Sequence, residues 1–168
     1  LGGPGCIVEI DEAKIGHRKY NRGRLLKGNW IFGEFERKSK KNFIMLVENR
    51  SEETLLACIK YWIMPGTTII SDCWKSYQCL NNEGFQHLTV NHTYNFVDPD
   101  SGAHTQNIER VWREFRANIP RYGRREYHLE GYLCEFLFKR AYAKNERIEN
   151  FFDLIAELYS PLSVREET

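Results

Sequence analysis

The sequence lacks long apolar runs, a paired set of cysteines and a large excess of charge of either sign. No apolar stretch approaches the roughly 20 residues that a membrane-spanning helix needs. The five cysteines are scattered, without a CxxC pair or a Cys/His zinc spacing, which predicts reduced thiols in an intracellular protein rather than a disulfide scaffold. The formal net charge is only +1, so bulk charge does not indicate a nucleic-acid-binding protein.

The chain does contain enough apolar material for one folded domain. Its 168 residues, 42% hydrophobic and 14% aromatic, are long enough to bury a core and argue against disorder. The first residues, Leu-Gly-Gly-Pro-Gly, include no initiator Met and no signal-peptide pattern. We therefore expect a piece of a longer protein, from which an upstream DNA-binding segment is absent.

Basic residues concentrate in one segment of this nearly neutral chain. Between Lys14 and Lys41 there are ten Lys/Arg residues against two acids. A strongly basic segment can hold a polyanion along one face, but it can equally be a solvated hairpin. The candidate DNA contacts in this segment are Arg18, Lys19, Arg22, Arg24 and Lys27.

Apolar patterning predicts a mixed α/β order. Alternating or β-branched runs predict strands at 6–10, 30–35, 43–47, 67–71 and 87–90. Helical recurrence predicts helices after the N-cap Ser51, at 74–80, from 105 to Pro120, at 124–144 and at 147–159. The order predicts a mixed five-stranded sheet flanked by helices, with extra C-terminal helices. We expect a single domain over 1–168, with a core at about 6–142 and a helical extension at 143–168.

Three acids lie at positions where the predicted strands and helix could bring their carboxylates together. Asp11 closes the first predicted strand, Asp72 closes the fourth, and Glu109 is on the first long helix. Adjacent strands and a helix over their ends can bring three carboxylates together, and clustered carboxylates repel one another unless a cation lies between them. Mg²⁺ prefers such oxygen ligands. Each acid also has a structural explanation: Asp11 could begin a turn, Asp72 could cap a helix, and Glu109 could favour a helix dipole.

Four segments carry a resemblance to a known family. They are Val8-Glu-Ile-Asp-Glu12, Ile70-Ser-Asp-Cys-Trp-Lys-Ser-Tyr77, the segment 90–99 and the segment 104–116 with its Asn-Ile-Glu-Arg. Together and in this order they resemble the DDE domain of Merlin-type transposases and their ISXO-like bacterial insertion-sequence relatives. Asp11 and Asp72 are 61 positions apart, and Asp72 and Glu109 are 37 apart, a short second interval like that of DDE enzymes.

The resemblance implies an RNase H-like fold and metal-dependent cleavage and joining of DNA strands. Asp11, Asp72 and Glu109 would be the catalytic acids and would hold two Mg²⁺ or Mn²⁺ ions. Asn107 is a minor competitor for the third position. The basic residue that the family often carries seven positions after the third acid would be Arg116, which is suited to holding a phosphate.

Further residues beside these motifs are candidates for contact with DNA. Trp74 could stack on a base or be a core aromatic, and Lys75 could hold a backbone phosphate. The remaining candidates, which could also be solvated or hydrogen-bonded surface residues, are His92, Asn95, His104, Asn107 and Arg113. Trp112 is expected to pack the helix of Glu109 against the sheet.

We therefore expect the catalytic domain of a transposase that performs cut-and-paste transposition. Its partner would be double-stranded DNA, both element ends and target, with a homodimer or larger assembly on DNA and no membrane. The protein would be nuclear in a eukaryote and cytoplasmic in a bacterium. Two alternatives remain: an RNase H-like nuclease without strand transfer, and a domesticated DNA-binding or interaction protein that keeps the fold.

Overall fold

The computed structural model describes residues 1–16, 28–91, 97–99, 101–120 and 126–159. Five strands, four α-helices and three short 3-10 helices follow one another in these parts of the chain. They are β1 (Ile7–Ile15), β2 (Asn29–Glu36), β3 (Asn42–Val47), α1 (Glu52–Trp62), β4 (Thr68–Asp72), η2 (Lys75–Tyr77), η3 (Leu80–Glu83), β5 (Gln86–Val90), α2 (Gln106–Asn118), η4 (Glu126–His128), α3 (Leu129–Ala141) and α4 (Arg147–Leu158).

The strands form one mixed sheet in the order β3-β2-β1-β4-β5. β1, β2 and β3 are antiparallel neighbours, whereas β1, β4 and β5 run parallel. The parallel half needs crossover connections, and α1 supplies the one between β3 and β4. The predicted mixed five-stranded sheet flanked by helices is confirmed.

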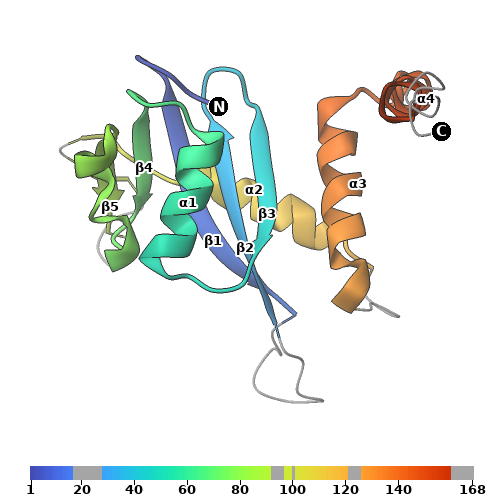
Figure 1. Ribbon diagram of the computed structural model, residues 1–168. Helices are drawn as coiled ribbons and strands as arrows, with labels where there is room; N and C mark the ends of the chain where they lie inside the picture. Colours follow the sequence, from blue (N-terminus) through green and yellow to red (C-terminus); the bar gives the residue numbers. More distant parts are fainter. Residues whose placement is uncertain (17–27, 92–96, 100, 121–125, 160–168) are drawn as a thin grey trace, which may run out of the picture.

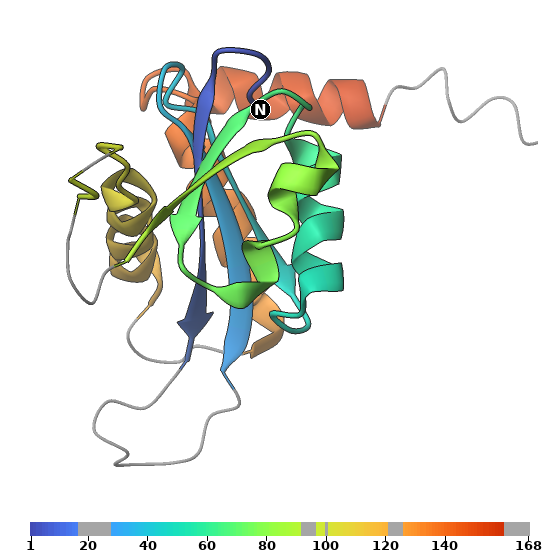
Figure 2. The ribbon, with the colours of Figure 1, turned by 90° about the vertical axis from the view of Figure 1, so that its left-hand side faces the viewer.

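Helices cover both faces of this sheet (Figures 1 and 2). α1 packs on one face, where Leu55 and Ile59 meet alternate residues of β1 such as Val8 and Ile10. α2 and α3 pack on the other face through a core that contains Ile108, Val111, Trp112, Phe115, Leu129, Leu133 and Phe136. Because strand side chains alternate between faces, odd-numbered residues of β1 face α2 and even-numbered ones face α1.

The first strand is longer than the sequence predicts. β1 runs past Asp11 to Ile15 because it pairs with β2 along its whole length, from Val8↔Glu36 to Ile15↔Asn29. The expectation that Asp11 closes the first strand was therefore wrong. Its pairing with β4 is shorter and ends at Glu9↔Ile70. At Asp11, β1 is therefore still paired with β2 but no longer with β4.

Two predicted helices also differ from the observed ones. The helix expected at 74–80 is two 3-10 helices, η2 and η3, with Tyr77 N bonded to Trp74 O and Gln78 N to Lys75 O. Burial of Tyr77 and the bond from the Ser76 hydroxyl to Arg50 O hold this tighter turn in place. The helix expected at 124–144 begins as η4 and continues as α3 to Ala141. The start of α1 is as predicted, with Ser51 Oγ accepting from Thr54 N.

The last helix, α4, buries none of its residues although one of its faces is apolar. Its contacts run to α3, where Phe151 meets Phe138 and Arg147 donates to Lys139 O. In Figure 1 it lies apart from the sheet. In the parts of the chain that the structure describes, no helix has both the length and the apolar character needed to cross a bilayer. The predicted domain limits stay a prediction.

One carboxyl group is buried in the α1-side core without a hydrogen-bond partner among the described residues. Glu34 of β2 is 1% exposed, and burial raises its pKa to about 8. An acid whose folded pKa lies above its ordinary value holds its proton in the folded state after the unfolded chain has lost it. The folded state therefore loses stability as pH rises between about 4.5 and 8.

We expect Glu34→Gln to reduce the decrease in folding stability with rising pH, because an amide cannot ionise. One pKa unit corresponds to about 1.4 kcal/mol, so the wild type should lose several kcal/mol more than the variant between pH 5 and 8. Urea denaturation at a series of pH values measures the difference. Glu36→Gln on the same strand is the control, because Glu36 has a pKa lowered by the Gly2 N–H and should not change this slope. Equal slopes in wild type and Glu34→Gln would contradict the prediction.

Candidate active site

Strand register brings two of the predicted acids level with each other. The parallel pairs are Ile7↔Thr68, Val8↔Ile69 and Glu9↔Ile70, and two more residues along each strand lead to Asp11 and Asp72. The paired residues of β1 and β4 are 61 positions apart in the chain, and so are Asp11 and Asp72. Both side chains also point to the face of the sheet that α2 covers, because side chains alternate along each strand. Their charges interact, because Asp72 contributes to raising the pKa of Asp11.

The third acid comes from α2, which crosses this face of the sheet. Glu109 lies in the first turn of the helix, where the Thr105 hydroxyl donates to its Oε1 at 3.2 Å. Asp11 and Glu109 line one cleft of about 620 Å³. Its other lining residues are Glu12, Ala13, Lys14, Trp30, Trp112, Arg113 and Arg116. The cleft opens beside the part of β1 that extends beyond its pairing with β4, so acids and cations share one concave surface.

A buried tryptophan joins the helix to the first aspartate. Trp112 Nε1 donates to Asp11 Oδ2 at 2.8 Å, and the ring is 3% exposed. Gly33 makes room for the ring, because an added Cβ there would lie 2.7 Å from Trp112 Cζ2. Gly33 is the cross-strand partner of Asp11. The expected packing role of Trp112 is therefore accompanied by a direct hydrogen bond to a predicted catalytic acid.

The surroundings of Asp11 leave its negative charge poorly compensated. Burial raises its pKa to about 7, and the neighbouring carboxylates of Glu12 and Asp72 add to this, against the opposing effect of the Trp112 hydrogen bond. A carboxyl in this state is stabilised by a cation placed between it and its acidic neighbours. The donors are all oxygens, which suits Mg²⁺ or Mn²⁺ rather than a soft metal ion.

The three acids do not form a ready-made metal site. Within the described residues, no group of three or more His, Cys, Asp or Glu side chains is placed to hold a metal ion together. The structure thus brings Asp11 and Asp72 into electrostatic contact and puts Asp11 and Glu109 on one cleft, without gathering all three. Two carboxylates with water and substrate phosphate are a common environment for Mg²⁺.

The next residue of β1, Glu12, has its hydrogen-bond partners on the other face of the sheet, although it also lines the cleft and interacts electrostatically with Asp11 and Asp72. Tyr77 donates to Glu12 Oε2 at 2.5 Å, and Arg50 Nη1 lies 3.4 Å from Oε1. Burial raises the pKa of Glu12, while the Tyr77 hydrogen bond and Arg50 lower it. The Arg50 guanidinium also lies 4.0 Å from the ring centroid of Trp30 and 4.4 Å from that of Trp74. Trp74 is therefore partly occupied by an internal cation–π contact.

Asp72 is not the N-cap of the short helix that follows it, because η2 has Trp74 in that position and no side-chain cap bond. Its Oδ1 accepts from Trp74 N at 3.0 Å at the end of β4. This contact involves only Oδ1, so it is compatible with metal binding through Oδ2. Lys75 follows on η2 and is exposed, which keeps it a candidate for contact with phosphate.

The other predicted contact residues fall into three groups. Arg113 and Arg116 are exposed and line the cleft. His104 and Asn107 instead face Glu9: the Asn107 amide donates to Glu9 Oε1 at 2.7 Å, and His104 Nδ1 lies 3.6 Å from the same oxygen. Seven further candidates lie outside the described residues. They are Arg18, Lys19, Arg22, Arg24, Lys27, His92 and Asn95.

Glu9 is the residue near the site that sequence reasoning missed. It is fully buried and accepts from Arg37 Nε at 2.7 Å as well as from α2. Arg37 of the basic segment is therefore paired internally. A signal was present, because an acid inside an apolar strand and two residues before Asp11 must share the face of Asp11. Its partners on α2, about a hundred positions away, could not be read from the sequence.

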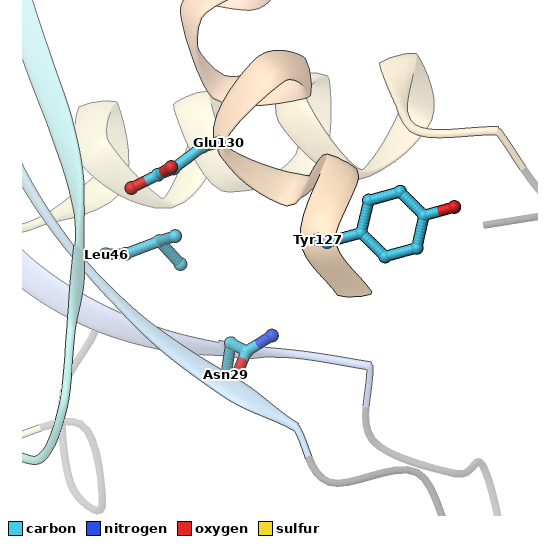
Figure 3. Close-up of a pocket in the computed structure, with 4 residues that line it drawn as sticks. All are labelled: Asn29, Leu46, Tyr127 and Glu130. Atoms are coloured by element: carbon cyan, nitrogen blue, oxygen red, sulfur yellow. The ribbon is translucent and has the colours of Figure 1, made fainter. Parts of the chain in front are cut away.

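A second hollow, of about 440 Å³, lies between the sheet and α3. Its lining residues are Asn29, Leu46, Tyr127 and Glu130. Figure 3 shows Leu46 and Glu130 between β3 and α3, with the ring of Tyr127 directed away from them. This lining includes a single acid, so the cleft beside β1 is the better candidate for an active site.

Comparison with known proteins gives a family match over most of the chain. The family model of the ISXO2-like transposase domain matches residues 1–141. An uncharacterized transposase-like protein of Haemophilus influenzae is 26% identical over 109 residues, which cover 63% of this chain and 87% of that protein.

Solved structures align less closely. The catalytic core domain of HTLV-2 integrase in complex with magnesium has a TM-score of 0.48 at 12% identity, covering 80% of this chain and 85% of that one. The catalytic core domain of BIV integrase has a TM-score of 0.44 at 15% identity, covering 67% of each chain.

Proposed function

Because the chain belongs to the family of ISXO2-like transposase domains, we propose that it cleaves and joins DNA strands by metal-dependent phosphoryl transfer. The transposase class agrees with the four sequence segments described above, whereas the Merlin-type assignment stays a prediction. In the proposed cycle, water first attacks the phosphodiester at an element end and frees a 3′-OH. This 3′-OH then attacks a target phosphodiester, whose own 3′ oxygen leaves.

We assign Asp11, Asp72 and Glu109 as the acids of this reaction. Asp11 and Asp72 would hold divalent ions with oxygen ligands, and Glu109 would complete the site from α2. A pair of such ions, when bound, would activate the attacking oxygen and stabilise the leaving one. Trp112 would orient the Asp11 carboxylate, while Arg113 and Arg116 would hold backbone phosphates on the cleft wall.

The observation that carries this proposal is the register of β1 and β4, which sets Asp11 level with Asp72. Burial and the neighbouring acids raise the pKa of Asp11 to about 7 in this arrangement, so a bound cation would stabilise its charged form. Paired acids beside a cleft with two arginines suit a polyanionic substrate that brings its own metal ions.

A strand-transfer assay tests the proposal. Pre-cut double-stranded ends, a supercoiled target and Mg²⁺ or Mn²⁺ are incubated with the protein, and joined products are resolved on a gel. We expect metal-dependent joining. Cleavage without joining would favour the nuclease alternative, and no reaction with either metal would favour a domesticated binding protein.

Phosphate contacts from the cleft predict a steep response to salt. Each phosphate neutralised contributes about 0.9 to the slope of log affinity against log salt concentration. We expect Arg116→Gln to lower this slope by about 1 and to weaken binding similarly for unrelated sequences. Fluorescence anisotropy at several salt concentrations measures it. Lys139→Gln on α3, which removes a cation paired with Glu135 away from the cleft, is the control and should leave the slope unchanged. An unchanged slope in Arg116→Gln would remove Arg116 from the DNA contact.

A further inference from the structure

The buried carboxylate of Glu9 binds the beginning of α2 from a strand about a hundred residues earlier in the chain. Its Oε2 accepts from the backbone N–H groups of Asn107 at 2.9 Å and Ile108 at 3.1 Å. Its Oε1 accepts from the side-chain amide of Asn107 and from Arg37 Nε, both at 2.7 Å. Three of these four donors belong to α2, and the fourth, Arg37, also donates to His104 O just before the helix.

This arrangement replaces the usual local cap of a helix. The first backbone N–H groups of an α-helix have no partner within the helix, and a Ser, Thr, Asp or Asn at the N-cap normally supplies one. The N-cap residue here, Thr105, makes no such bond, and its hydroxyl donates to Glu109 instead. Glu9 does the capping, and its negative charge also lies at the favourable end of the helix dipole.

A cap that comes from the sheet has a geometric consequence that a local cap lacks. A helix capped by its own residue can shift over the sheet without losing the cap. α2 cannot do so, because its cap is part of β1. A second link, from Trp112 to Asp11, joins the same helix to the same strand. Glu109 lies between these two links on α2, and Asp11 lies two residues after Glu9 on β1.

We propose that Glu9 is a positioning residue that fixes α2 over β1 and thereby sets the placement of Glu109 relative to Asp11. This inference rests on the proposed function for its catalytic consequence. Glu9 itself is fully buried and does not line the cleft, so it acts through the helix rather than on the substrate. Groups that support the ligands of a metal site in this way typically affect metal affinity or activity by about 10- to 100-fold.

Glu9→Gln tests the proposal. The amide keeps the size of the side chain, but in either orientation its NH₂ faces two donors, so two of the four hydrogen bonds are lost. We expect turnover in strand joining to fall by about 10-fold or more, a higher Mg²⁺ concentration for half-maximal rate, and an unchanged KM for DNA. The indole N–H resonance of Trp112 should also shift in NMR spectra recorded without metal or DNA.

Ile59→Val is the matched control for a general loss of stability. It removes a buried methyl group from α1 on the opposite face of the sheet and should change neither turnover nor the Trp112 resonance. Asn107→Ala, which removes one donor of α2 and keeps the helix, serves if Glu9→Gln does not fold. It should change turnover and the resonance in the same direction by a smaller amount.

The two readouts separate this inference from the proposed function. If Glu9→Gln, or Asn107→Ala in its place, matches Ile59→Val in both turnover and the Trp112 resonance, Glu9 is only a stabilising residue and the proposal is wrong. If the wild type joins no DNA, the proposed function fails, and the resonance alone still decides whether Glu9 positions α2.

Discussion

Replacing Asp72 by Asn is expected to abolish metal-dependent strand cleavage while leaving DNA binding nearly unchanged. The substitution removes the charge that the proposed metal site needs. Loss of one charge-stabilising group in an active site commonly lowers turnover by about 10²–10³-fold, and loss of a metal ligand should cost at least as much. Cleavage of a radiolabelled, uncut double-stranded element end in Mg²⁺ and in Mn²⁺ measures the effect, with anisotropy to follow DNA binding.

The Asp72→Asn substitution should leave the local structure intact. Asp72 Oδ1 accepts from Trp74 N, and the Asn side-chain oxygen can keep that bond. The fold after β4 should therefore survive, so lost activity cannot be attributed to unfolding. Asp153→Asn on the exposed side of α4 removes the same charge far along the chain and should leave cleavage unchanged. Cleavage at the wild-type rate by Asp72→Asn would end the assignment of this acid.

Gly33→Ala is expected to destabilise the protein and to impair the site at once. The added Cβ would meet the ring of Trp112, at 2.7 Å from Cζ2 and closer still to Cη2. Overpacking a core in this way costs about 1–3 kcal/mol, although Ala is otherwise the better residue in a strand. A displacement of the ring would disturb the hydrogen bond from its N–H to Asp11 Oδ2. We therefore expect a lower melting temperature and a loss of cleavage larger than the loss of folded protein explains.

Gly131→Ala gives the matched comparison for this change. Gly131 lies on α3, and an added Cβ there has no heavy atom within 4 Å. Replacing a helical glycine by alanine stabilises by up to about 1 kcal/mol. The same chemical change should thus have opposite signs at the two positions in thermal denaturation. A stable and active Gly33→Ala would show that Trp112 is not needed where the structure places it.

Much of the fold follows from local patterns in the sequence. The stripe Ile108, Val111, Trp112 and Phe115 predicts the buried face of α2, and Ser51 predicts the start of α1. Both are confirmed, because helix periodicity and the local cap of α1 depend on residues near one another. The predicted end of β1 was wrong because it depends on a residue contact that is not local. How far a strand extends depends on its partner, and β2 pairs with it through Ile15.

The site follows from the sequence only in part. The residue types and their order indicate Asp11, Asp72 and Glu109, yet their relation in space depends on the register of β1 and β4 and on where α2 is anchored. That anchor is Glu9, whose bonds to Asn107 and Ile108 join residues about a hundred positions apart. Long-range hydrogen bonds of this kind leave no local periodicity, so only coordinates reveal them.

The pairing of β1 with β4 also bears on how relatives of this chain can vary. Asp11 and Asp72 are level because Ile7 pairs with Thr68, and not because a set number of residues lies between them. Lengthening or shortening the β1–β2 connection or α1 would alter the count and leave the two carboxylates where they are. In distant homologues, each aspartate should therefore lie a fixed number of residues after the start of its own strand. The number of residues between the two aspartates can vary.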